Sequence, residues 1–179
     1  KICIQLNFQK TIYGLKKFQE EMKDYPIEIT YNIFGDGLQE DIDILKQSIE
    51  KCKLEQIVKY HGRKNHSEIQ EYLDNSNIGI SYVPITDYFN CQPPTKTFEY
   101  INSGMICLAT NTNENKKIIN DDNGKLCVDD IEGFKNALLE IYDKIENYDS
   151  ILIRKTVEKY AWSKIVENKV KIMFESLGK

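Results

Sequence analysis

The segment PPTKTFEYINSGMICLAT, residues 93–110, decides the fold because it predicts a short helix that leads directly into a buried strand. Pro93 and Pro94 end any preceding strand, and proline is favoured in the first turn of a helix. Gly104 ends the predicted helix, and the apolar run 105–111 has the length of a buried strand. A helix followed at once by a buried strand is typical of a parallel sheet covered by helices on both faces.

The same alternation of strands and helices extends through most of the chain. Apolar, β-branched runs predict six strands, at residues 1–6, 27–34, 56–62, 77–84, 105–111 and 125–129. Apolar residues at helical spacing separate them, and the pattern after residue 129 is helical only. We therefore expect a doubly wound, Rossmann-like α/β fold with a parallel six-stranded sheet. Residues 1–147 would form the core, and 148–179 a helical C-terminal tail.

Composition excludes several classes of protein. The 179 residues suffice for one domain, and a net charge of -4 argues against binding to nucleic acid. Five cysteines without a CxxC pair and only two histidines indicate neither a disulfide framework nor a metal site, and they fit a reducing cytoplasm. No stretch of about twenty apolar residues occurs, so the sequence predicts no transmembrane helix. The chain opens in a strand-like run without a leader, so we expect a fragment of a longer protein.

Parallel α/β sheets bind ligands outside the carboxyl ends of their strands. The functional residues should therefore lie in the loops that follow strands, which are residues 7–11, 35–37, 61–65, 84–95 and 111–114.

The helix that begins near Pro94 is the main candidate for a binding site. Its first N–H groups would point toward the mouth of the sheet and form an anion site, to which Thr95 could add a hydroxyl. Lys96 and Glu99 are i, i+3 neighbours, so a simple ion pair within the helix is one interpretation. However, a lysine in the first turn opposes the helix dipole. A bound polyanion would remove this disadvantage, and Glu99 could then accept hydrogen bonds from sugar hydroxyls.

Two other loops carry weaker signals. The GDG turn, residues 35–37, is either a tight turn or a backbone approach to a ligand. Arg63, just past a strand end, could contact a planar base or a phosphate, or it could be a solvated surface charge. His61 is better explained by a structural role than by catalysis.

Taken together, these segments resemble the C-terminal, donor-binding domain of the GT-B fold, family 4-type retaining glycosyltransferases. The resemblance covers nearly the whole chain and rests on five segments in order: IFGDGLQEDIDIL (33–45), VKYHGRKNHSEIQEYLDNSNIGISYVP (58–84), PPTKTFEYINSGMICLAT (93–110), DDNGKLCVDDIEGFKNALLEIY (121–142) and KYAWSKIVENKV (159–170). It implies an enzyme that transfers a sugar from a UDP- or GDP-sugar to an acceptor, with retention of configuration, in polysaccharide, glycolipid or glycoconjugate biosynthesis.

The resemblance also implies roles for individual residues. Glu99 corresponds to the glutamate that binds the ribose, and Lys96 and Glu99 are the expected catalytic residues. The diphosphate would contact Pro94, Thr95 and Lys96. The base would lie near Gly62 and Arg63, while Cys91, Gln92 and Pro93 would face the donor sugar. Neither a cofactor nor a metal is implied.

Two departures from the family pattern affect these expectations. The family often has a second glutamate eight positions before the ribose glutamate, and Cys91 stands there in this chain. The family's glycine–arginine pair after the first strand is replaced by Asn7 and Phe8, so Lys10 is the candidate to supply that cation to the diphosphate.

The expected partners are the sugar donor, a sugar or lipid-linked acceptor, and an N-terminal GT-B domain to which the tail helices would cross. Without that domain the fragment should be inactive. Attachment to the inner face of the membrane stays open, because Lys164, Lys169 and Lys171 on the last helix fit either a membrane surface or solvent. Two alternatives to a transferase also remain: a nucleotide-sugar epimerase half, and a degenerate, non-catalytic α/β module that acts as a partner or scaffold.

Overall fold

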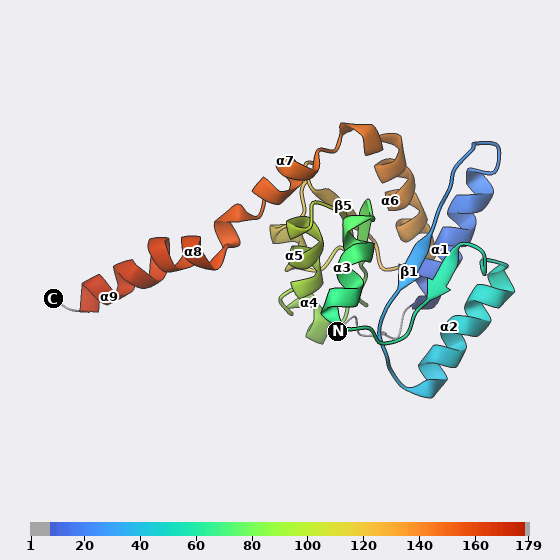
Figure 1. The fold of residues 1–179 in the computed structure, drawn as a ribbon, viewed down its shortest axis with the longest axis horizontal. Coiled ribbons are helices and arrows are strands. Elements are labelled where there is room, and N and C mark those ends of the chain that lie inside the picture. The colour runs from blue at the N-terminus through green and yellow to red at the C-terminus, as the bar shows by residue number, and fades with distance from the viewer. Residues whose placement is uncertain (1–7, 178–179) are drawn as a thin grey trace.

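The computed structural model describes residues 8–177, and its elements alternate along the chain as the sequence predicts (Figure 1). The strands are β1 (Tyr31–Ile33), β2 (Val58–Tyr60), β3 (Ile78–Ser81), β4 (Ile106–Thr110) and β5 (Gly124–Cys127). The α-helices are α1 (Phe8–Glu21), α2 (Gln39–Cys52), α3 (His66–Asp74), α4 (Asp87–Asn90), α5 (Thr95–Asn102), α6 (Ile131–Asp143), α7 (Ser150–Lys155), α8 (Trp162–Ile165) and α9 (Lys171–Leu177). Short 3-10 turns lie at η1 (Asn115–Lys117), η2 (Ile145–Asn147) and η3 (Glu158–Tyr160), and a π-helical turn, η4 (Val166–Val170), joins α8 to α9.

All paired strands are parallel, which confirms the predicted α/β class. β1 pairs with β2, and β3, β4 and β5 pair in that order. Every residue of β4 is buried, as expected for the middle strand of a sheet with two covered faces. Because the strands are parallel, their carboxyl ends share one edge within each group.

The structure describes five of the six predicted strands, and the sixth, at residues 1–6, lies outside the described residues. The expected strand at 27–34 is shorter than predicted, with three residues in β1. It begins later than predicted, at Tyr31, and ends at Ile33. Shortly after it, Gly35 has a φ of 139°, and its N–H donates to the carbonyl of Gly62 at 2.9 Å. The GDG segment thus contacts the loop after β2, and its two interpretations, a tight turn or a backbone approach to a ligand, stay predictions.

Helices pack on the strands through apolar side chains. α5 contacts β3 and β4, while α6 contacts β4, β5 and α1, and α1 lies between α6 and α2. The largest fully buried apolar side chains of this core come mostly from helices, namely Ile12, Leu45, Ile101, Phe134, Ile141 and Ile153. Leu108 comes from β4, and Leu54 and Met105 come from connecting segments.

One local expectation needs correction. Residues 86–92, expected as a loop, contain the one-turn helix α4, because the hydroxyl oxygen of Thr86 accepts a hydrogen bond from the N–H of Phe89 at 3.2 Å. α5 buries Thr97, Tyr100 and Ile101, and Phe98 is half-buried.

The C-terminal helices fall into two parts. α7 packs on α5, and Ile153 and Val157 are buried in the core. The helical segment from α8 to α9 instead projects away from the α/β body (Figure 1). Several of its apolar side chains are exposed, with 78% of Trp162 and 64% of Phe174 accessible to solvent. No helix within residues 8–177 is both long and apolar enough to cross a bilayer.

Candidate functional site

The start of α5 lies where the sequence predicts the site, after the strand-end segment that follows β3. Thr95 is exposed, and Lys96 and Glu99 are half-buried and form an ion pair. The N–H of Thr95 donates to the carbonyl of Pro93 at 3.0 Å. The N–H groups of Lys96 and Thr97 have no acceptor within the helix by helical geometry. The helix therefore presents two backbone donors and one ammonium group on the same turn.

Buried hydrogen bonds fix this turn to the sheet. The Thr97 hydroxyl donates to Asn115 Oδ1 at 2.7 Å and lies 2.9 Å from the Ser81 hydroxyl, from which it accepts. The Asn115 side chain in turn donates to the carbonyl of Thr110, the last residue of β4. These contacts tie the first turn of α5 to the carboxyl ends of β3 and β4, so the position of Lys96 is set by the sheet.

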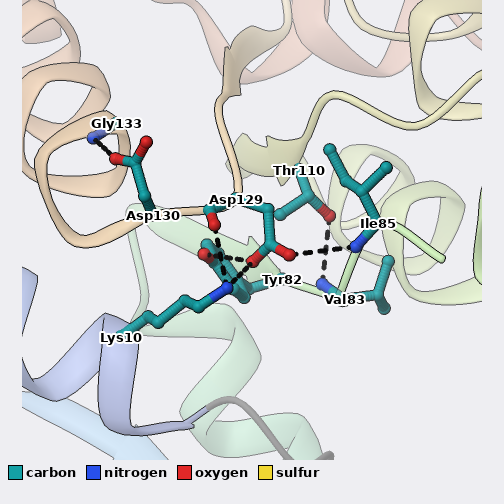
Figure 2. Close-up of polar contacts among 8 residues, drawn as sticks. All are labelled: Lys10, Tyr82, Val83, Ile85, Thr110, Asp129, Asp130 and Gly133. Carbon is teal, nitrogen blue, oxygen red and sulfur yellow. Dashed lines mark hydrogen bonds and ion pairs between the residues drawn. The ribbon is translucent and has the colours of Figure 1, made fainter.

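The segment between β3 and α5 is also held at several points (Figure 2). The N–H of Val83 donates to the hydroxyl of Thr110 at 3.0 Å, and the N–H of Ile85 donates to Asp129 Oδ2 at 3.1 Å. Tyr82 donates its hydroxyl proton to the other oxygen of the same carboxylate at 2.7 Å.

Lys10 joins this cluster from α1. Its ammonium donates to Asp129 Oδ1 and to the Asp129 carbonyl, each at 2.8 Å. Figure 2 shows the Lys10 side chain extending from α1 toward Asp129 and Tyr82. The cation predicted for the diphosphate is thus at the carboxyl edge of the strands, and Asp129 neutralises it there.

The electrostatics of the cluster follow from these contacts. Partial burial alone would raise the pKa of Asp129, but hydrogen bonds from Lys10, Tyr82 and Ile85 outweigh it and hold that pKa below its usual value. Burial, followed by the hydrogen bond to Asp129, raises the pKa of the Tyr82 hydroxyl. Asp129 is therefore an anion and Tyr82 a neutral donor at neutral pH.

The loop after β2 holds the other predicted residues. Arg63 is exposed and lies 3.3 Å from Asp36 of the GDG turn. His61 Nε2 lies 2.8 Å from Asn32 Oδ1, and the His61 ring stacks on Phe34 with centroids 4.7 Å apart. These contacts agree with a structural role for His61. Gly62 is on the same turn and contacts Gly35 through its carbonyl.

A cavity of about 280 Å³ shows which of these loops face one another. Its lining includes Phe34 after β1, Tyr82 and Val83 after β3, and Thr95 and Lys96 of α5. Cys91, Gln92 and Pro93 are exposed on the segment that precedes α5.

Sequence reasoning missed Asp129 and Tyr82. Asp129 ends the run KLCVD, so its position at a strand end is the sequence feature that could have indicated a site residue. Its role depends on Lys10 and Ile85, which are 119 and 44 residues away along the chain, so no local pattern could indicate it. Among residues 8–177, no group of three or more His, Cys, Asp or Glu side chains could hold a metal ion.

The fold and the arrangement of strand-end loops define a Rossmann-like α/β domain of the GT-B type. The sequence model of a known family, described as glycosyl transferases group 1, matches residues 5–144. The match spans most of the chain, and the chain therefore belongs to this family. A search among curated proteins finds no match.

Solved structures of glycosyltransferases share the fold. The lipopolysaccharide outer core galactosyltransferase WaaB, in its apo form, has a TM-score of 0.73 at 18% identity over 96% of this chain. The Anabaena protein HepE, in complex with UDP and glucose, has a TM-score of 0.69 at 16% identity over 94% of the chain. Sucrose-phosphate synthase from Thermosynechococcus elongatus has a TM-score of 0.61 at 16% identity over 97%.

This chain spans less than half of each of these proteins, namely 46% of WaaB and 44% of each of the other two. It therefore corresponds to one of the two halves of a GT-B enzyme, in agreement with the expected C-terminal domain.

Proposed function

We propose that this chain is the donor-binding part of a retaining glycosyltransferase, which transfers a sugar from a UDP- or GDP-sugar to an acceptor hydroxyl. The observation that carries the proposal is the first turn of α5, where a lysine and a glutamate lie beside backbone donors at the carboxyl edge of a parallel sheet. Membership of the glycosyl transferases group 1 family supports the same conclusion.

The diphosphate of the donor would lie at the start of α5. Backbone N–H groups at a helix start attract anions, and Lys96 adds a full positive charge. As the bond to the sugar breaks, negative charge develops on the departing diphosphate. Fixed dipoles together with Lys96 and Lys10 would stabilise that charge without a metal ion.

The ribose would lie on the flank of the same helix. A carboxylate can accept hydrogen bonds from two adjacent hydroxyls, and Glu99 is one turn beyond the diphosphate position. In the structure Lys96 pairs with Glu99. A bound diphosphate would draw Lys96 toward itself, and the ribose hydroxyls would then replace the ammonium as donors to Glu99.

The remaining assignments extend from this helix. The base would contact Gly62 and Arg63, and the donor sugar would face Cys91, Gln92 and Pro93. The exposed segment from α8 to α9 would contact the N-terminal half of the enzyme, which would supply the acceptor site. The whole protein would act in the cytoplasm on sugar or lipid-linked acceptors in polysaccharide or glycoconjugate synthesis.

Calorimetric titration with UDP and with GDP, in the absence of metal, tests the donor site directly. We expect one nucleotide to bind, and Glu99→Ala to weaken its binding about tenfold or more, because two hydrogen bonds to a charged acceptor are lost. Glu20→Ala is the matched control, since Glu20 also pairs with a lysine of its own helix, Lys16 of α1, but lies at the far end of that helix.

Equal affinities of the two variants would contradict the assignment of Glu99. Failure of the folded protein to bind either nucleotide would favour a non-catalytic module instead.

A further inference from the structure

Asp129 stands where three distant segments of the chain meet. It follows β5, while Lys10 belongs to α1, and Tyr82 and Ile85 follow β3 (Figure 2). All of these positions are at helix starts or strand ends on the ligand-binding edge of the fold. One carboxylate therefore connects the predicted diphosphate cation to the segment that leads to α5.

The contacts use both carboxylate oxygens. Lys10 and Tyr82 donate to Oδ1 at 2.8 and 2.7 Å, and the backbone of Ile85 donates to Oδ2 at 3.1 Å. The side chain of Asp129 is only 17% exposed, so these charge-assisted bonds are shielded from water. Removing the carboxylate charge would weaken all three contacts together.

The geometry also limits what Lys10 can do. An ammonium group has three N–H donors, and Asp129 accepts two of them through its side chain and its carbonyl. The third donor is left for an acceptor outside this pair. A flexible lysine is thereby confined to one position, which reduces the entropy that it would lose on binding a ligand.

We propose that Asp129 is a positioning residue of the donor site, which holds Lys10 and the backbone of Ile85 in the arrangement that a bound diphosphate uses. Asp129 acts through these two groups and does not contact the donor. The proposal rests on the donor-binding function proposed above. It adds to the donor site a residue that lies outside α5.

The neighbouring Asp130 provides a matched control. Its carboxylate accepts a hydrogen bond from the N–H of Gly133 at 2.6 Å and caps α6. Asp129→Asn and Asp130→Asn remove the same charge from adjacent positions, so they change the overall electrostatics equally. Only Asp129→Asn replaces an acceptor oxygen with an amide N–H₂ group that faces the donors of Lys10, Tyr82 and Ile85.

The first measurement is the affinity for UDP and GDP. We expect Asp129→Asn to weaken nucleotide binding about tenfold, and Asp130→Asn to change it less than about twofold. In a Lys10→Ala background, Asp129→Asn should have a clearly smaller effect, because part of its action passes through Lys10. Equal effects of the two asparagine variants would overturn the proposal. So would tighter binding by Asp129→Asn, which would make Asp129 a competitor of the diphosphate for Lys10.

The second measurement needs no ligand. Hydrogen exchange of the Ile85 amide and acylation of the Lys10 amine, both followed by mass spectrometry, should become faster in Asp129→Asn and stay unchanged in Asp130→Asn. If the wild-type protein binds neither nucleotide, the proposed function fails and the role of Asp129 in a donor site fails with it, while these rates still decide whether Asp129 holds Lys10 and Ile85. Unchanged rates in Asp129→Asn would overturn the proposal.

Discussion

At the scale of the single residue, His61 in the loop after β2 makes the stability of this protein depend on pH. Partial burial, followed by the nearby charge of Lys64, lowers the pKa of His61 below its usual value. The unfolded chain, with a histidine pKa of about 6.5, therefore takes up a proton before the folded chain does. The free energy of unfolding should fall as the pH falls from about 7 through the lowered pKa of His61.

His61→Gln tests this dependence, because glutamine retains a polar group near Asn32 but does not titrate. We expect the free energy of unfolding in urea to change less between about pH 5.5 and pH 7.5 in this variant than in the wild type. His66→Gln is the control for the other histidine of the chain. If the pH dependence in His61→Gln equals that of the wild type, the lowered pKa of His61 is contradicted.

At the scale of elements, the position of α5 depends on a glycine in β3. A Cβ added at Gly79 would lie 2.3 Å from Cγ and 2.5 Å from Cβ of Tyr100. The Cβ of Tyr100 is fixed to the backbone of α5, so a change of rotamer cannot relieve the contact and the helix itself must move. The absence of a side chain at residue 79 thus allows α5 to pack closely on the sheet.

Gly79→Ala should lower the free energy of unfolding by about 1–3 kcal/mol, the usual range for overpacking of a core. It should also speed amide hydrogen exchange in α5. Gly62→Ala is a suitable comparison, because no atom lies within 4 Å of its added Cβ and only the φ of 68° is strained. Fast exchange in α5 in both variants, or in neither, would contradict this explanation.

At the scale of the whole molecule, the C-terminal helices differ in how they contribute to stability. α7 supplies Ile153, which is 1% exposed, and Val157, at 2%, follows it. The segment from α8 to α9 keeps Trp162 and Phe174 largely in water. Large exposed apolar surfaces mark sites of interaction with other proteins, and here the proposed occupant is the N-terminal half of the enzyme.

Deletion of residues 162–179 should therefore change the Tm of the α/β body by less than about 4 °C, equivalent to about 1 kcal/mol for a chain of this size. It should also reduce the binding of a hydrophobic dye. Deletion of residues 150–179 is the contrasting variant, since it removes Ile153 and Val157 from the core and should prevent stable folding. A large fall in Tm for the shorter deletion would show that the last helices stabilise the body.

Much of this architecture could be predicted because it depends on local patterns. The period of apolar residues indicated the helices. At the start of α3 the contact is also local, because the backbone N–H of Asn65 donates to Glu68 at 2.9 Å. The start of α5 could be predicted from Pro94 and the first-turn residues. The roles proposed for Lys96 and Glu99 came from the family resemblance and remain predictions.

The sequence by itself determined the order of strands and helices, the parallel class of the fold and the location of a candidate site at the start of α5. These features depend on side-chain periodicity and on backbone preferences over a few residues. Only the tertiary structure revealed the cluster around Asp129, the buried face of α5 and the contrast between α7 and the exposed last helices. Each of these depends on contacts between residues far apart in the chain, which burial and hydrogen bonding select only after the elements have packed.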